Sequence, residues 1–112
     1  MGSYYASEHL GQFGNIAQGN TDLAEKFFAW YNAVFAEGAL TEREKALIAL
    51  GVAHAVQCPY CIDAYTKTCL EKGSDLEQMT EAVHVASAIR GGAALVHGVQ
   101  MLEHARHAGM AG

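Results

Sequence analysis

Apolar residues recur at intervals of three and four along most of this chain, which is the spacing of amphipathic α-helices. The pattern predicts five helices, at residues 21–38, 41–56, 59–73, 74–92 and about 93–107. No segment alternates apolar and polar residues with the period of two that marks a half-buried strand. We therefore predict an all-α fold.

The predicted helix boundaries rest on capping signals. Thr41 and Glu44 have the spacing of a capping box, in which each side chain accepts a hydrogen bond from the other residue's backbone N–H. Ser74 and Glu77 repeat that spacing, and Thr21 could cap the first helix in the same way. Prolines suit the first helical position, as at residue 59, and glycines end the predicted helices at positions 38, 73 and 91–92.

Length and composition indicate one domain. The chain has 112 residues, of which 51% are apolar and 17% are charged. Disordered chains have far fewer apolar residues, so this one should fold. We expect a single domain over residues 1–112, with a leader segment at residues 1–20 ahead of the first helix.

Charge and hydropathy exclude several kinds of partner. The formal net charge is −5 and no basic cluster exceeds two residues, so we expect no binding to nucleic acids or anionic membranes. The longest nearly apolar run, residues 46–56, is far shorter than the roughly 20 residues of a membrane-spanning helix. The first residues show neither a secretion signal nor a lipidation signal, so we expect a cytoplasmic protein.

Two cysteines are the strongest candidates for chemistry. Cys58 and Cys61 stand at the start of a predicted helix, about one turn apart, which is close enough to form a disulfide. The unpaired N–H groups and the positive end of that helix favour the thiolate of the first cysteine. If the preceding helix continues to the pair, His54 lies one turn before Cys58 on the same face and could relay protons. This arrangement is typical of thiol–disulfide exchange.

A structural metal site is the alternative for the same segment. His54, Cys58, Cys61 and Cys69 together could hold zinc, although such sites normally show a second closely spaced pair of ligands. Cys69 would lie about 12 Å beyond Cys61 on a continuous helix, so we expect it to be a small buried side chain instead. Glu44 shares a helix face with Cys58 but lies about 21 Å away along the axis, so we expect it to act as a cap.

Three stretches carry a resemblance to a known family. They are Leu40-Thr-Glu-Arg-Glu-Lys-Ala-Leu-Ile-Ala-Leu, His54 through Cys61, and Glu81-Ala-Val-His-Val-Ala followed by Gly91-Gly-Ala-Ala-Leu-Val-His. Residues 40–101 resemble the carboxymuconolactone decarboxylase superfamily in its alkylhydroperoxidase D-like branch. Tyr4-Tyr5 and Phe27-Phe-Ala-Trp-Tyr make the chain most similar to the peroxidase-like proteins associated with arsenosugar biosynthesis. The resemblance implies a bundle of about five to six helices, a redox-active cysteine pair, and trimers or hexamers.

The proton relay of that branch is missing here. Alkylhydroperoxidase D carries a glutamate twelve residues before the first cysteine and a histidine four after the second, and these positions are Ala46 and Tyr65 in this chain. We therefore expect His54 to take over proton transfer, with Tyr65 as its hydrogen-bond partner. Decarboxylase activity is not expected, because decarboxylating members do not depend on a cysteine pair and nothing here forms a recognisable lactone site.

These observations predict an alkylhydroperoxidase-like enzyme that reduces peroxides or exchanges disulfides through Cys58 and Cys61. His54, Tyr65 and Glu44 are the further candidate site residues. The enzyme would need no cofactor and no metal, and an external thiol or dithiol would re-reduce it. The alternative is a non-enzymatic oligomeric binding protein, with or without zinc at the cysteines.

The apolar content also predicts a homo-oligomer. The chain is half apolar, and three predicted helices carry apolar side chains on more than one side, so it has more apolar surface than a small monomer can bury. The residues are Phe27 with Phe28, Leu47 with Ile48 and Leu50, and Val83 with Val85. Association with further copies would cover the remainder. Leu95, Val99 and Leu102 form a stripe on the last predicted helix. That stripe could serve either an interface or an intramolecular core, and the sequence leaves both possibilities open.

Overall fold

The computed structural model describes residues 5–109, and every regular element in that range is helical. The elements are α1 (Ser7–Leu10), the 3-10 helix η1 (Phe13–Gln18), α2 (Thr21–Phe35), α3 (Glu42–Ala55), α4 (Pro59–Glu71), α5 (Leu76–Val96) and α6 (Gly98–His107). The predicted all-α fold is confirmed. None of the helices described combines the length and the apolar character needed to cross a bilayer.

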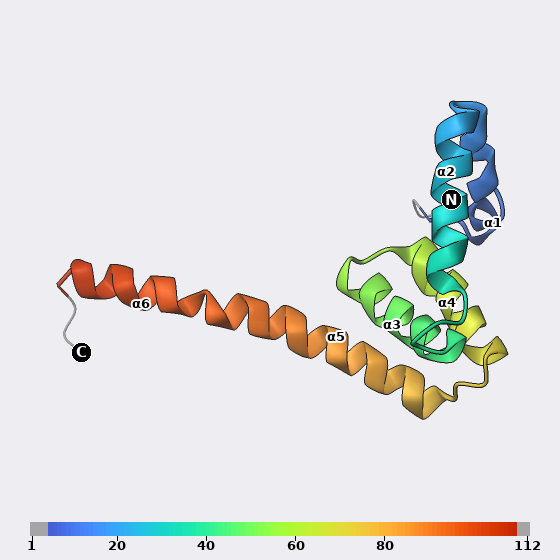
Figure 1. The fold of residues 1–112 in the computed structure, drawn as a ribbon. Coiled ribbons are helices and arrows are strands. Elements are labelled where there is room, and N and C mark those ends of the chain that lie inside the picture. The colour runs from blue at the N-terminus through green and yellow to red at the C-terminus, as the bar shows by residue number, and fades with distance from the viewer. Residues whose placement is uncertain (1–4, 110–112) are drawn as a thin grey trace.

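The helices form a small bundle from which a long arm projects (Figure 1). α3 packs against both α4 and α5, and α2 lies beside η1 at one end of the bundle. The arm consists of residues 91–107, the end of α5 together with α6, and it points away from the other helices. The radius of gyration is 19.4 Å, whereas a compact chain of this length would have about 13 Å. A single copy therefore leaves much of its surface uncovered.

The predicted helix end at Gly91 and Gly92 is wrong. α5 continues through both glycines to Val96, and only His97 separates it from α6. A glycine ends a helix when it adopts the left-handed conformation, as Gly73 does with a φ of 88° after α4. Gly91 and Gly92 do not adopt it, and the alanines that follow them favour a helix. The predicted fourth and fifth helices thus form one nearly continuous rod.

Capping fixes where α2 and α3 begin. The Thr41–Glu44 box is confirmed, since the N–H of Glu44 donates to Thr41 Oγ1 at 3.0 Å and the N–H of Thr41 donates to Glu44 Oε1 at 2.8 Å. The predicted cap of α2 is displaced by one residue. Asn20 rather than Thr21 accepts from the N–H of Leu23, at 3.1 Å. Both residue types cap helices well, so adjacent candidates compete.

α5 begins one residue later than predicted. Asp75 rather than Ser74 accepts from the N–H of Gln78, at 2.8 Å, and the side chain of Gln78 rather than Glu77 closes the box at 3.1 Å. Ser74 is buried in the turn that follows α4, where its N–H donates to the carbonyl of Cys69 at 2.9 Å. The backbone of Ser74 therefore completes the end of α4 instead of starting α5.

α2 ends at Phe35, three residues before the predicted stop at Gly38. The ammonium group of Lys45, on α3, accounts for this end. Its Nζ donates to the carbonyls of Val34 and Ala36, at 2.7 and 2.6 Å. A cation at the carbonyl end of a helix satisfies groups that have no partner within the helix.

The buried core lies where α3, α4 and α5 meet. Ala46, Leu50, Cys69 and Met79 form it. Cys69 is fully buried, which confirms the expectation that it fills space in the core. The same location places Cys69 away from the surface on which the other two cysteines lie.

Candidate functional site

The cysteine pair lies at the start of α4. Cys58 is the N-cap residue, Pro59 occupies the first helical position as predicted, and Cys61 follows in the first turn. The two sulfur atoms are 2.8 Å apart, and the N–H of Cys61 donates to Cys58 Sγ at 3.4 Å. Both thiols are free and partly buried. One helical turn thus presents two thiols within easy reach of a disulfide.

The two thiols differ in acidity. A hydrogen bond from the Cys61 thiol lowers the pKa of Cys58, and the N–H groups of Cys61 and Tyr60 lower it further, against the opposing effect of burial. Burial raises the pKa of Cys61 to about 11, and the neighbouring Cys58 adds to that rise. Cys58 is therefore the more readily ionised thiol, and Cys61 is the proton donor beside it.

A backbone break separates the pair from α3. α3 ends at Ala55, and Gln57 adopts the left-handed conformation with a φ of 58°, which is uncommon for a residue other than glycine. The N–H of Cys58 donates to the carbonyl of Ala53 at 3.0 Å, which closes this turn. The predicted proton relay required a helix that continues from His54 to Cys58. The structure shows that the helix ends before Cys58.

His54 lines a different cavity from the thiols. Its Nδ1 lies 2.8 Å from the carbonyl oxygen of Leu50, one turn earlier in α3. The imidazole faces a shallow hollow that it shares with Gln57 and Pro59, and neither cysteine lines that hollow. The structure thus places His54 behind the turn that carries the pair.

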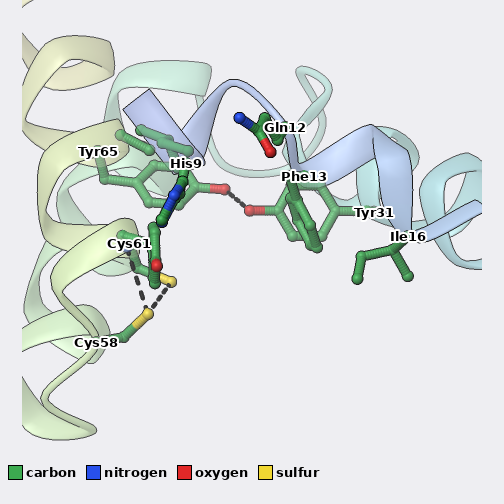
Figure 2. A pocket seen from close by; sticks show the side chains of 11 residues that line it. His9, Gln12, Phe13, Ile16, Tyr31, Cys58, Cys61 and Tyr65 are labelled. Carbon is green, nitrogen blue, oxygen red and sulfur yellow. Dashed lines mark hydrogen bonds between the residues drawn. The ribbon is translucent and has the colours of Figure 1, made fainter. Parts of the chain in front are cut away.

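Tyr65 does lie with the thiols, but its partner is not His54. Its hydroxyl shares a hydrogen bond with the hydroxyl of Tyr31, on α2 (Figure 2). Its ring stacks on Phe35, with the centroids 5.1 Å apart. Burial and the bond to Tyr31 raise the pKa of Tyr65, so the phenol stays protonated. In the sequence, Tyr31 contributes only to the family resemblance, as the last residue of Phe27-Phe-Ala-Trp-Tyr, so its place in this site was missed.

The thiols open into a cavity of about 410 Å³. α4 contributes Cys58, Tyr60, Cys61, Ala64 and Tyr65 to its lining, α2 contributes Tyr31, and the leader contributes His9, Leu10, Gln12, Phe13 and Ile16. In Figure 2, Phe13 and Ile16 lie toward Tyr31 and away from the thiols, whereas His9 is drawn on the side of Tyr65 and the thiols. No role for the leader could be predicted from the sequence, because its small and polar residues form no catalytic motif.

A cluster that we call the Asp63 clamp holds the leader against α4; it consists of Tyr5, Ser7, Asp63 and Lys67. The hydroxyls of Tyr5 and Ser7 both donate to Asp63 Oδ2. Lys67 Nζ lies 2.9 Å from Asp63 Oδ1. The hydrogen bonds from Ser7, Tyr5 and Lys67 lower the pKa of Asp63, so its carboxylate remains an acceptor at neutral pH. The tyrosine ring also packs edge-on against Tyr60, with the centroids 4.7 Å apart.

The other candidate residues lie away from the thiol cavity. Glu44 closes the capping box at the first turn of α3, whereas the cysteine pair follows the last turn. Within residues 5–109, no three histidine, cysteine, aspartate or glutamate side chains come together as ligands for a metal ion. The proposed set of His54, Cys58, Cys61 and Cys69 is therefore not assembled.

Comparison with known proteins places this site within a described family. The sequence model of the carboxymuconolactone decarboxylase family matches residues 21–104, which include the thiol pair and exclude the leader. A protein from Paracoccus denitrificans, described as uncharacterized protein 4 in cox locus, is 42% identical over 84 residues. The match covers 75% of this chain and 76% of that protein.

Solved structures share the fold. A crystal structure of a protein from Methanobacterium thermoautotrophicum is 35% identical with a TM-score of 0.73, covering 77% of this chain and 97% of that one. An apo carboxymuconolactone decarboxylase family protein from Legionella pneumophila is 28% identical with a TM-score of 0.68, covering 86% of each chain. On the match over residues 21–104, the chain belongs to the carboxymuconolactone decarboxylase family.

Proposed function

We propose that this protein is a thiol-dependent oxidoreductase that cycles between the Cys58–Cys61 dithiol and its disulfide. A peroxide or a small disulfide oxidises the pair, and an external thiol or dithiol reduces it again. One observation carries the proposal: the two sulfur atoms lie 2.8 Å apart at the start of one helix, and the pKa is lowered for Cys58 and raised for Cys61. Their difference in acidity assigns the attack to Cys58 and the second step to Cys61.

With a hydroperoxide, the reaction takes place in two balanced steps. The Cys58 thiolate attacks the terminal oxygen, the O–O bond breaks, and the alkoxide takes up one proton and leaves as an alcohol. Cys61 then attacks the Cys58 sulfenic acid, the S–O bond breaks, and water leaves with the Cys61 proton. Two electrons pass from the dithiol to the peroxide. With a disulfide, the leaving groups are two thiols instead.

Ala46 and Tyr65 occupy the positions of the glutamate and the histidine in the proton relay of alkylhydroperoxidase D, and neither supplies a proton for these steps. Ala46 lies in the buried core with 1% of its surface exposed, and its methyl group has no acid function. Tyr65 holds its proton, because burial raises its pKa. Nothing in the cavity provides for decarboxylation of a lactone, so we do not propose that activity.

Counting thiols before and after oxidation tests the proposal. One equivalent of tert-butyl hydroperoxide or of bis(2-hydroxyethyl) disulfide should remove Cys58 and Cys61 from the three titratable thiols and leave the buried Cys69. Zinc analysis of the same sample tests the alternative. Equimolar zinc with unreactive thiols would support a non-enzymatic binding protein and contradict the redox proposal.

Cys61→Ala is expected to shift the reactivity of Cys58 to higher pH. The thiolate is the form that reacts with iodoacetamide, so the alkylation rate rises with pH through the pKa of Cys58. The main cause of the lowered pKa is the hydrogen bond from Cys61, and alanine removes that donor. Cys61→Ser keeps a hydroxyl donor and should stay closer to the wild-type midpoint. An unchanged midpoint in Cys61→Ala would show that another group stabilises the thiolate.

We also propose that copies of the chain associate through the arm, residues 91–107. Its apolar side chains are uncovered in a single copy: Leu95 is 81% exposed and Val99 is 61% exposed. Figure 1 shows the arm extending away from the bundle, so these residues do not serve the bundle core. A stripe of this kind is covered when copies of one chain pair along it, as is usual in symmetric oligomers.

A further inference from the structure

We propose that His9 is the acid–base catalyst of the thiol cavity, which gives a proton to the group that leaves when Cys58 reacts. The inference rests on the proposed redox role of the Cys58–Cys61 pair. His9 belongs to α1 in the leader, outside the residues 21–104 that match the family. His9 lines the same cavity as both thiols, and Figure 2 draws its imidazole on the side of the cavity where Tyr65 and the thiols lie.

The chemistry of the cavity lining supports this assignment. The titratable side chains that line it are Cys58, Cys61, Tyr60 and Tyr65 from α4, Tyr31 from α2, and His9 from the leader. Its lining residues include no aspartate, glutamate, lysine or arginine. An imidazole is the one side chain that ordinarily exchanges a proton near neutral pH. His9 therefore fits the role of the acid that protonates the leaving group.

The leader is attached on both sides of the cavity, which sets the position of His9. On one side, the Asp63 clamp ties Ser7, two residues before His9, to the helix that carries the thiols. On the other side, Phe13 packs edge-on against Phe28 of α2, with the ring centroids 5.0 Å apart. The segment between these two attachments includes His9, Leu10 and Gln12, which line the cavity.

The proton is needed at one defined moment. When the Cys58 thiolate breaks an O–O bond, an alkoxide leaves, and when it breaks the S–S bond of an alkyl disulfide, an alkyl thiolate leaves. Both are strong bases, so protonation by an imidazolium lowers the barrier. When Cys61 closes the disulfide, its proton leaves with the second leaving group, as water or as a thiol, and His9 is left neutral. His9 regains its proton when an external dithiol re-reduces the pair to the Cys58 thiolate and the Cys61 thiol, because that step releases one proton.

A comparison of leaving groups tests this role. The reagents are tert-butyl hydroperoxide, bis(2-hydroxyethyl) disulfide and 5,5′-dithiobis(2-nitrobenzoate), whose aromatic thiolate leaves without a proton. His9→Ala is expected to slow the first two reactions of Cys58 by about 10²-fold, the low end for a positioned acid. The third reaction should change by less than about twofold, because it depends on the thiolate alone.

Two further variants and one addition separate catalysis from structure. His9→Gln keeps a polar side chain without an acid and should show the same selective loss. Imidazole added to the buffer should restore part of the rate of His9→Ala and leave the wild type unchanged. His84→Ala, on α5 and outside both the cavity lining and the arm, is the matched control and should react as the wild type.

If His9→Ala slows all three reactions equally, His9 has a structural role and the proposal is overturned. Unchanged rates in His9→Ala would also overturn the proposal. The proposal also fails if His54→Ala, rather than His9→Ala, shows the selective loss. The redox function is judged separately, by whether the oxidised wild type contains a Cys58–Cys61 link. If that link is absent, the role of His9 is still decided by how fast Cys58 reacts with bis(2-hydroxyethyl) disulfide and with 5,5′-dithiobis(2-nitrobenzoate).

Discussion

Cys58→Ser is expected to abolish oxidation of the pair and turnover of any peroxide or disulfide substrate. The hydrogen bond with Cys61 and the N–H groups at the helix start lower the pKa of Cys58, which makes it the more readily ionised thiol, whereas a serine hydroxyl in its place stays protonated at neutral pH. Cys61 does not replace it, because burial is the main cause of the raised pKa of Cys61 and persists in the variant. Peroxide loss in the presence of dithiothreitol, with mass spectrometry of the linked peptides, measures the effect.

Two variants serve as controls for Cys58→Ser. Cys61→Ser keeps the attacking thiolate, so oxidation should proceed to a Cys58 sulfenic acid or mixed disulfide and stop there. Cys69→Ala removes a thiol that lies in the core, away from the cavity, and should leave the Cys58–Cys61 link intact. A Cys61–Cys69 link in the oxidised wild type, or turnover by Cys58→Ser, would contradict the assignment.

Val99→Glu is expected to dissociate the oligomer while preserving the helices. The wild type should have a mass of three or six chains of 12.0 kDa each, and the variant should shift toward a single chain. Burying an unpaired carboxylate in an apolar interface costs several kcal/mol. In a single copy, Val99 is 61% exposed, so the same carboxylate stays in water and the fold is not disturbed. Light scattering and circular dichroism on the same sample measure mass and helicity.

Gln100→Glu provides the matched control for Val99→Glu. It adds the same charge on the same helix at an exposed polar position, so the wild-type mass should be retained. A wild type that remains at 12.0 kDa at micromolar concentration would contradict the assembly. Loss of helicity in Val99→Glu would show instead that this residue serves a core.

Among the residues described, the sequence by itself determined the helical class of the chain and the location of its close pair of thiols. Both depend on local physics. The periodic apolar positions and the Thr41–Glu44 box act within a few residues, so they could be interpreted without the fold. The proximity of Cys58 and Cys61 is set in the same way, by a single helical turn that starts at Pro59.

Only the tertiary structure decided which groups surround the thiols. Gln57, with its left-handed backbone, breaks the helix that would have carried His54 to the pair, and no residue-type preference predicts that conformation for glutamine. Tyr31 and Tyr65 meet although they are 34 positions apart in sequence. Contacts of this range depend on how whole helices pack, and local patterns carry no record of them.

The tertiary structure also decided the roles of the two ends of the described chain. Tyr5 and Asp63 are 58 positions apart, and their contact brings a leader without a catalytic motif to the thiol cavity. At the other end, the apolar stripe of the arm could have faced inward or outward from its periodicity alone. An amphipathic pattern identifies the apolar side of a helix. The position of the helix relative to the bundle determines whether that side packs on the bundle or stays exposed in a single copy.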